Sequence, residues 1–201
     1  MTTPMDLLIV ILETASDRPV EEGDLSLALA GAELVDLVDA GAVTLDGDRI
    51  VPGTQRAMDD RLLDLAQSSL RRETPYESVE DWLWRRGSGL SKAYRARLEP
   101  EEQPARQRHG WFRRRSGRTA PTGSPAVRRT PERWTSREPA LTGLAAAVGI
   151  HEEPAGAFEG FDADALVTVL AAVNDAVTEL AGVRQQRQIE EAAFDNIWRA
   201  P

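Results

Sequence analysis

The sequence predicts a mainly α-helical protein, folded as a single helical domain with small β-hairpins and a long basic loop. Three observations lead to this prediction. Apolar residues recur at helical spacing along most of the chain. Two short alternating runs flank an Asp-Gly pair, as in a hairpin. Residues 99–139 carry Pro, Gly, Ser and Arg in place of apolar residues. A chain of 201 residues with 41% hydrophobic residues can form one well-packed core.

The first half of the chain is expected to begin with two helices and a hairpin. Asp6–Glu13 is very apolar and is expected to form a short buried helix, although its length also allows a strand. Asp24 is expected to cap a helix that runs to about Ala40 and ends at Gly41. Alternating apolar residues predict a hairpin over residues 42–52.

Three shorter helices are predicted next. The first spans roughly residues 57–72. The second begins near Ser78 and ends at Gly87, and the third covers Gly89–Leu98. The basic loop over 99–139 follows them.

The C-terminal third is predicted to be helical again. Leu141–Val148 should form a short apolar helix, and a longer helix should follow, with Asp162 or Asp164 at its N-terminus. The predicted domain covers residues 4–183, and residues 184–201 form a polar C-terminal tail. Apolar residues near its end are spaced for a last amphipathic turn that docks on the body or on a second subunit: Phe194, Ile197 and Trp198.

The charge is distributed very unevenly. The net charge is −9, but the stretch from Arg85 to Arg137 holds 15 basic and 4 acidic residues, a local charge of +11 that leaves −20 for the rest. A concentrated basic segment in an acidic protein favours binding of one anionic surface through one face. The alternative is that the basic loop pairs with the acidic helices of its own chain.

The residues that catalysis needs are scarce. The chain has no cysteine and only two histidines, so thiol chemistry and zinc binding are excluded and a cytoplasmic location is the simplest interpretation. Neither a nucleophile elbow nor a glycine-rich phosphate loop occurs. Paired carboxylates such as Asp59-Asp60 are expected by chance among 33 acidic residues. The sequence therefore predicts no catalytic residues, no metal site and no cofactor.

The basic loop contains one aromatic pair. Trp111 and Phe112 stand directly before Arg113, Arg114 and Arg115. Aromatic rings favour the headgroup boundary and arginines pair with lipid phosphate, so this segment is predicted to insert into a membrane surface. Two alternatives remain open: the rings fold back onto the domain, or they stack on single-stranded nucleic acid.

The order of these segments resembles the Golgi phosphoprotein 3 family, including its bacterial members. The resemblance is carried by five segments in succession: Asp6–Leu12, Leu27–Leu37, the hairpin around Val43–Leu45, Asp60–Asp64, and Ser78–Leu83 leading into Tyr94–Leu98. It covers residues 6–98 and, in pattern only, residues 141–180. It implies a mostly helical domain that binds membranes peripherally, recognises phosphatidylinositol 4-phosphate in a basic pocket, inserts an apolar-tipped hairpin and holds protein cargo.

Carried onto this chain, the resemblance implies a set of lipid-binding residues. Two pocket cations are matched by Lys92 and Arg95, and the hairpin falls at Trp111 and Phe112. Where the family has a tryptophan and an arginine, this chain has Glu21 and Ala30, which favours general anionic-lipid binding over phosphoinositide selectivity. Together with the arginines of the loop, the predicted headgroup-binding residues are Lys92, Arg95, Arg97, Arg113, Arg114 and Arg115.

The predicted function is that of a cytoplasmic, peripherally membrane-associated adaptor or scaffold without catalytic activity, whose partners are an anionic phospholipid surface, a protein cargo and a second copy of the chain. A winged-helix nucleic-acid-binding protein is the first alternative, because a helix followed by a hairpin spans Asp24–Pro52. That helix is acidic and DNA would repel it, so nucleic acid is not the expected partner. A purely protein-binding scaffold is the second alternative.

Overall fold

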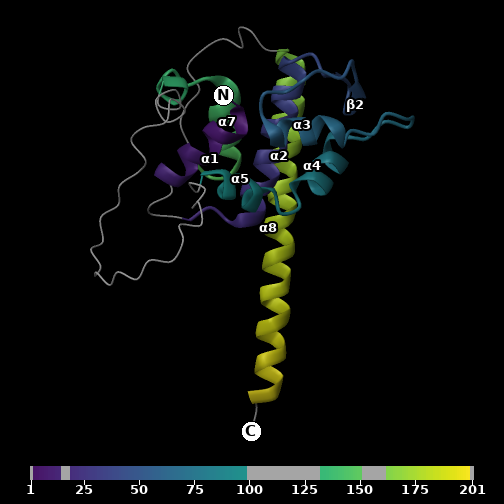
Figure 1. Ribbon diagram of the computed structural model, residues 1–201. Coiled ribbons are helices and arrows are strands. Elements are labelled where there is room, and N and C mark those ends of the chain that lie inside the picture. Colours follow the sequence, from purple (N-terminus) through teal and green to yellow (C-terminus); the bar gives the residue numbers. More distant parts are fainter. Residues whose placement is uncertain (1, 15–18, 99–131, 151–161, 200–201) are drawn as a thin grey trace, which may run out of the picture.

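The computed structural model describes residues 2–14, 19–98, 132–150 and 162–199 (Figure 1). The named elements occur in the following order along the chain: α1 (Thr3–Thr14), α2 (Glu22–Asp39), β1 (Val43–Asp46), β2 (Arg49–Pro52), α3 (Arg61–Ser68), α4 (Val79–Gly87), α5 (Leu90–Leu98), α7 (Pro139–Ala147) and α8 (Ala163–Arg199). The prediction of a mainly helical protein with a small hairpin is confirmed.

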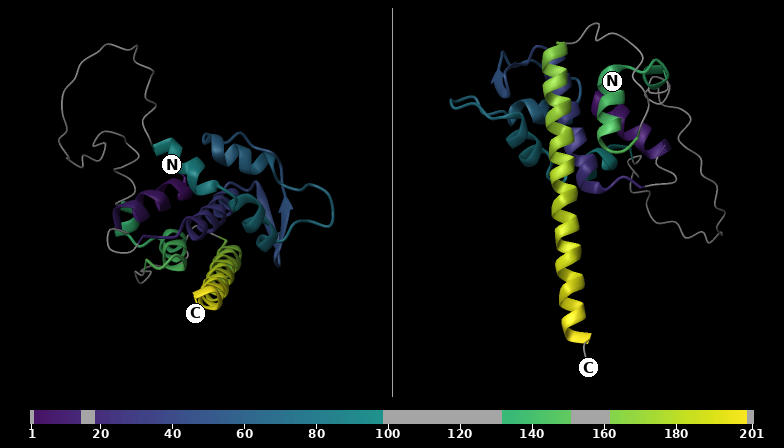
Figure 2. Two further views of the ribbon diagram at one scale, coloured as in Figure 1. Left: turned by 90° about the horizontal axis from the view of Figure 1, so that it is seen from below. Right: turned by 180° about the vertical axis from the view of Figure 1, so that it is seen from behind.

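The central element is α2. Figure 2, left, shows it between α1, α7 and α8 on one side and α3 with the hairpin on the other. Its side chains are buried from Leu25 to Val35 without interruption, as expected of a helix with neighbours all around it. It ends as predicted, with Gly41 in the left-handed conformation at φ +64°. Asp24 is not its N-cap, because the helix begins earlier, at Glu22, with Glu21 in the cap position.

The predicted N-terminal helix is confirmed as α1. Its Leu7, Leu8 and Ile11 are at most 2% exposed, and the helix packs against α2 and α7. The backbone N–H of Thr3 donates to Asp36 on α2 at 2.9 Å, which ties the start of α1 to the end of α2.

The predicted hairpin is confirmed as well. Strands β1 and β2 are antiparallel, with Leu45 opposite Ile50 and Gly47 at φ +61° in the turn. The hairpin also contacts the segment before α4, because the backbone N–H of Ile50 donates to the carbonyl of Glu77 at 2.9 Å.

The helices α4 and α5 match their predictions, whereas α3 is shorter. Residues 57–72 were expected to be helical, but α3 covers only Arg61–Ser68. The reason is local: Asp60 accepts hydrogen bonds from the backbone of Leu62 and Leu63 and therefore starts the helix. Ser78 caps α4 by accepting from the N–H of Asp81 at 3.0 Å.

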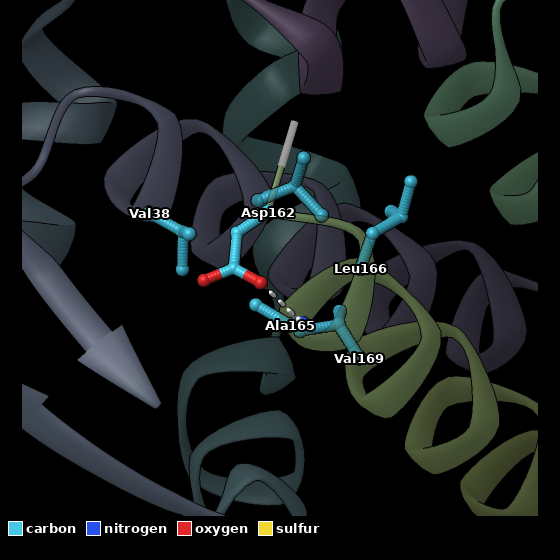
Figure 3. A pocket seen from close by; sticks show the side chains of 6 residues that line it. Val38, Asp162, Ala165, Leu166 and Val169 are labelled. Carbon is cyan, nitrogen blue, oxygen red and sulfur yellow. Dashed lines mark hydrogen bonds between the residues drawn. The ribbon is translucent and has the colours of Figure 1, made fainter. Parts of the chain in front are cut away.

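The C-terminal part consists of α7 and the long α8. Asp162 caps α8 by accepting from the N–H of Ala165 at 3.1 Å (Figure 3). The segment Ala163–Ala192 is long and apolar enough to cross a membrane by length and composition, a criterion that a core helix also meets. Val169 and Val173 are fully buried, and α8 packs against α2, α4 and α7, so this part of α8 belongs to the core.

The last residues of α8 extend away from the other helices (Figure 1). The helix crosses from the predicted domain (4–183) into the predicted tail (184–201) without a break as far as Arg199. That division stays a prediction. Within the stretch expected as a basic loop (99–139), residues 132–135 form one helical turn and α7 begins at Pro139. Residues 99–131 lie outside the described residues.

Candidate functional site

Helix α5 carries the three predicted headgroup-binding cations that the structure describes, and all three are exposed. Lys92 lies 3.3 Å from the carboxylate of Glu22 at the start of α2. Arg97 forms an ion pair with Asp60, the cap of α3. Arg95 lies one helical turn from Lys92 and makes no ion pair or hydrogen bond with the residues that the structure describes. Lys92 and Arg95 are therefore close on one exposed face.

A groove lies next to these cations, between the start of α2, the turn from α4 to α5, and α8. Its volume is about 330 Å³. Leu27, Trp84 and Leu180 supply its apolar surface, and Glu22, the partner of Lys92, lies at its edge. The remaining lining residues are Gly23, Ser26, Gly87, Ser88 and Gly89. We call this surface, together with Lys92 and Arg95, the α2–α5 groove.

Two properties of α2 shape the α2–α5 groove. Glu21, in the cap position, makes no side-chain hydrogen bond to the first turn, and the backbone N–H groups at a helix N-terminus attract anions. Gly23 permits the close approach of α8, because a Cβ there would lie 2.7 Å from Cδ2 of Leu180. The carboxylates of Glu21 and Glu22 oppose anion binding at the same place, since both are exposed at the first turn.

A buried polar network is centred on Glu33, further along α2 than the groove residues. Arg86 of α4 donates to both carboxylate oxygens of Glu33, at 2.7 and 2.8 Å, and to the carbonyl of Leu62 at 3.1 Å. The hydroxyl of Tyr94 on α5 donates to the same carboxylate at 3.0 Å. The Glu33 side chain is 0% exposed, and this burial raises the pKa of its carboxyl group despite the opposing effect of Arg86. The network fixes α4 and α5 relative to α2.

Sequence reasoning missed this network. The signal was present in part, because Glu33 is the one charged residue in the apolar run from Leu25 to Val35. A carboxylate in the middle of such a run needs a buried partner. The sequence does not say which of the 24 basic residues supplies it.

A second structural contact shows what role Ala30 has, one of the two positions at which this chain departs from the family. Its side chain is 0% exposed, and its carbonyl accepts from Nε1 of Trp82 at 3.1 Å. Arg85 lies over the Trp82 ring, 5.2 Å from the centroid, and also donates to Glu77 at 2.6 and 2.7 Å. Ala30 is therefore a core residue and not part of the groove surface, whereas Glu21 is exposed beside it.

Part of the positive charge between Arg85 and Arg137 is paired with carboxylates of the same chain. Four arginines face carboxylates whose side chains are at most 12% exposed, and one of them, Arg133, belongs to the stretch expected as a basic loop (99–139). These four residues are Arg85, Arg86, Arg97 and Arg133. Arg133 joins Asp6 of α1 to Glu138 and so anchors the chain just after residue 131.

The remaining predicted site residues lie outside the described residues. They are Trp111, Phe112, Arg113, Arg114 and Arg115, and their roles stay predictions. Among the residues that are described, no three acidic, histidine or cysteine side chains form a group that could hold a metal ion.

A second cavity, between α2 and the start of α8, is a packing void. Its volume of about 10 Å³ is at the lower limit for one water molecule. Figure 3 shows its lining, with Val38 on one side and Ala165, Leu166 and Val169 on the other. It is too small for a ligand.

The fold and the groove together define a helical protein whose exposed features are a cationic helix face and an adjoining groove. A family model described as Golgi phosphoprotein 3 matches residues 4–192, and the chain belongs to this family. The resemblance stated from the sequence is thus confirmed. Searches of curated proteins and of solved structures give no match to the chain.

Proposed function

We propose that this protein is a peripheral membrane-binding adaptor without catalytic activity, which contacts anionic lipid through the α2–α5 groove. The observation that carries the proposal is Lys92, which is exposed and lies 3.3 Å from Glu22 at the start of α2, with the exposed Arg95 one helical turn away. Family membership supports a role in lipid or protein binding. The sequence adds further positive charge directly after α5, since residues 99–131 hold eight arginines and three glutamates.

The ion pair between Lys92 and Glu22 does not prevent lipid binding. The two side chains are 76% and 56% exposed. An exposed pair of this kind contributes about 0–1 kcal/mol to stability. A basic residue near an anionic leaflet gains about 1 kcal/mol, so a lipid phosphate can replace Glu22 as the partner of Lys92. Binding through such contacts is sensitive to salt.

The proposed ligand is anionic lipid in general. A phosphoinositide-selective pocket needs several cations that converge on one headgroup. Here, within the described residues, the two cations Lys92 and Arg95 are accompanied by the exposed carboxylates of Glu21 and Glu22 at the start of α2. The acidic side chains weaken the attraction for a multiply charged headgroup, while contact with a diffuse anionic surface remains favourable.

The structure also bears on the nucleic-acid alternative. In a winged-helix protein, the helix before the hairpin would have to enter a DNA groove. Here α2 occupies that place in the chain, and most of its residues are buried beneath other helices. A membrane surface or a protein partner, which can contact α5 from outside, fits the described surface better.

Co-sedimentation with vesicles tests the proposal. We expect the full chain to pellet with vesicles containing phosphatidylserine, to remain soluble with purely zwitterionic vesicles, and to lose binding as salt is raised. Arg95→Glu should weaken pelleting. Arg56→Glu is a matched control, since that arginine lies beside Gly41, at the opposite end of α2. Equal pelleting by the Arg95 variant, or none by the unaltered chain, would refute lipid binding through α5.

A further inference from the structure

The cavity of the α2–α5 groove and the cations beside it have opposite electrostatic character. Lys92 and Arg95 lie on the exposed face of α5 and do not line the cavity itself, which we call the hollow. Among the described residues that line the hollow, Glu22 is the only charged one, and its side chain is 56% exposed. The neighbouring Glu21 is exposed and adds a second negative charge at the start of α2. The hollow is therefore complementary to a cation, whereas the face of α5 is complementary to an anion.

The other lining residues suit a small organic cation. Trp84, in the last turn of α4, supplies aromatic surface, and Leu27 and Leu180 supply aliphatic surface. Cations are attracted to the face of a tryptophan ring. The rest of the lining is small and leaves room for a ligand in the volume of about 330 Å³: Gly23, Ser26, Gly87, Ser88 and Gly89. An alkylammonium group therefore fits the hollow in charge, polarity and size.

The charges at the edge of the hollow match a ligand that carries both signs. Nζ of Lys92 lies 3.3 Å from Oε1 of Glu22. In a phosphoethanolamine group, only two methylene groups separate the anionic phosphate from the ammonium. With the phosphate at Lys92 and the ammonium at Glu22, each of the four charges is next to charges of opposite sign. Binding then completes the exposed ion pair and does not have to break it.

The hollow favours a primary ammonium over a quaternary one. A primary ammonium donates hydrogen bonds, and charge-assisted bonds to a carboxylate are strong. The methyl groups of a choline headgroup cannot donate to Glu22 and keep the positive charge farther from it. Quaternary ammonium ions are bound in cages of several aromatic rings, whereas Trp84 is the only aromatic residue among the described lining residues.

We propose that the α2–α5 groove recognises the phosphoethanolamine headgroup of a membrane lipid, with the phosphate at Lys92 and the primary ammonium at Glu22 in the hollow. This inference rests on the proposed binding of anionic membranes through α5, and it names a second lipid that binds beside the anionic ones. The headgroup has no net charge, so it does not attract the protein from solution. It adds a short-range contact once the protein lies on an anionic surface.

Two vesicle compositions test this preference. Both contain the same fraction of phosphatidylglycerol, which supplies negative charge without an amine, and the remainder is phosphatidylethanolamine in one and phosphatidylcholine in the other. In co-sedimentation the full chain should bind the phosphatidylethanolamine vesicles about threefold more tightly, the effect expected of one exposed ion pair.

Variants separate recognition of the headgroup from general effects of the bilayer. Glu22→Gln should bind both compositions equally, because the neutral amide no longer attracts the ammonium. Differences in lipid packing between the vesicles act on this variant and on the unaltered chain alike. Glu191→Gln is the matched control, an exposed carboxylate near the C-terminal end of α8, and it should keep the preference.

The outcomes distinguish this inference from lipid binding itself. Binding to neither composition would overturn both proposals. Equal binding of the unaltered chain to both compositions, or a preference that Glu22→Gln retains, would overturn the headgroup assignment and leave binding to anionic membranes in place. An oligoarginine peptide that binds the unaltered chain but not Glu22→Gln, without any preference between the vesicles, would assign the hollow to a basic protein segment and overturn the proposal equally.

Discussion

The buried pair of Glu33 and Arg86 allows a quantitative test of how the fold is held together. Replacing Arg86 by Met removes two hydrogen bonds to Glu33 and one to the carbonyl of Leu62. The Glu33 side chain stays fully buried and keeps only Tyr94 as a described hydrogen-bond donor. Loss of one partner of a buried ion pair costs about 3–5 kcal/mol. We expect Arg86→Met to lower the free energy of unfolding by that amount.

Urea unfolding followed by circular dichroism measures this loss. The companion double variant Glu33→Gln/Arg86→Met removes both charges, so it should recover most of the stability that the single variant loses. In the single variant Glu33 no longer faces a cation, so the loss should shrink as the pH falls and the carboxyl takes up a proton. A loss below about 1 kcal/mol, the value typical of exposed pairs, would refute the buried-pair reasoning. A double variant no more stable than the single one would refute it equally.

Three further predictions concern other parts of the structure. Burial raises the pKa of Asp36 from 3.8 to about 6, so the folded state holds the proton more tightly and this group's contribution to stability is lost as the pH rises through that window. Asp36→Asn should flatten the change in unfolding free energy over this range, and an unchanged slope would contradict the assignment. Gly31→Ala should destabilise the fold by about 1–3 kcal/mol, because the new Cβ would lie 2.5 Å from Cγ2 of Val173. Thermal unfolding measures this loss. An unchanged melting temperature would contradict the packing of α8 on α2. Glu22→Gln should strengthen binding to anionic vesicles at low salt up to about fivefold, because it removes the carboxylate that competes for Lys92. The exposed control Glu179→Gln should leave binding unchanged. Weaker binding by the Glu22 variant would argue against competition at the groove.

The sequence by itself determined the elements whose limits depend on neighbouring residues. Ser78 predicted the start of α4, Gly41 predicted the end of α2, and the Asp-Gly turn predicted the hairpin. Caps and turns are formed by groups within about four residues of one another, so the local sequence contains the necessary information. Where several local signals compete, the prediction fails by a few residues, as it did at the start of α3.

The candidate site could be predicted only as residue types. The sequence indicated that Lys92 and Arg95 are available cations, but their surroundings were not visible in it. Glu22 lies 70 residues before Lys92 in the chain and faces it only because α2 and α5 pack together. The role of Ala30 likewise became visible only in the structure, where this residue lies in the core and its carbonyl accepts a hydrogen bond from the Trp82 indole N–H.

Only the tertiary structure decided which charges remain available for a partner. Arg86 and Arg95 are equivalent in the sequence, two arginines in neighbouring amphipathic helices. Packing placed Arg86 against Glu33, a residue 53 positions away, and left Arg95 on the exposed face of α5. The physical reason is that a buried carboxylate requires a partner within hydrogen-bonding distance, and that distance is set by how helices pack in space, not by their separation along the chain.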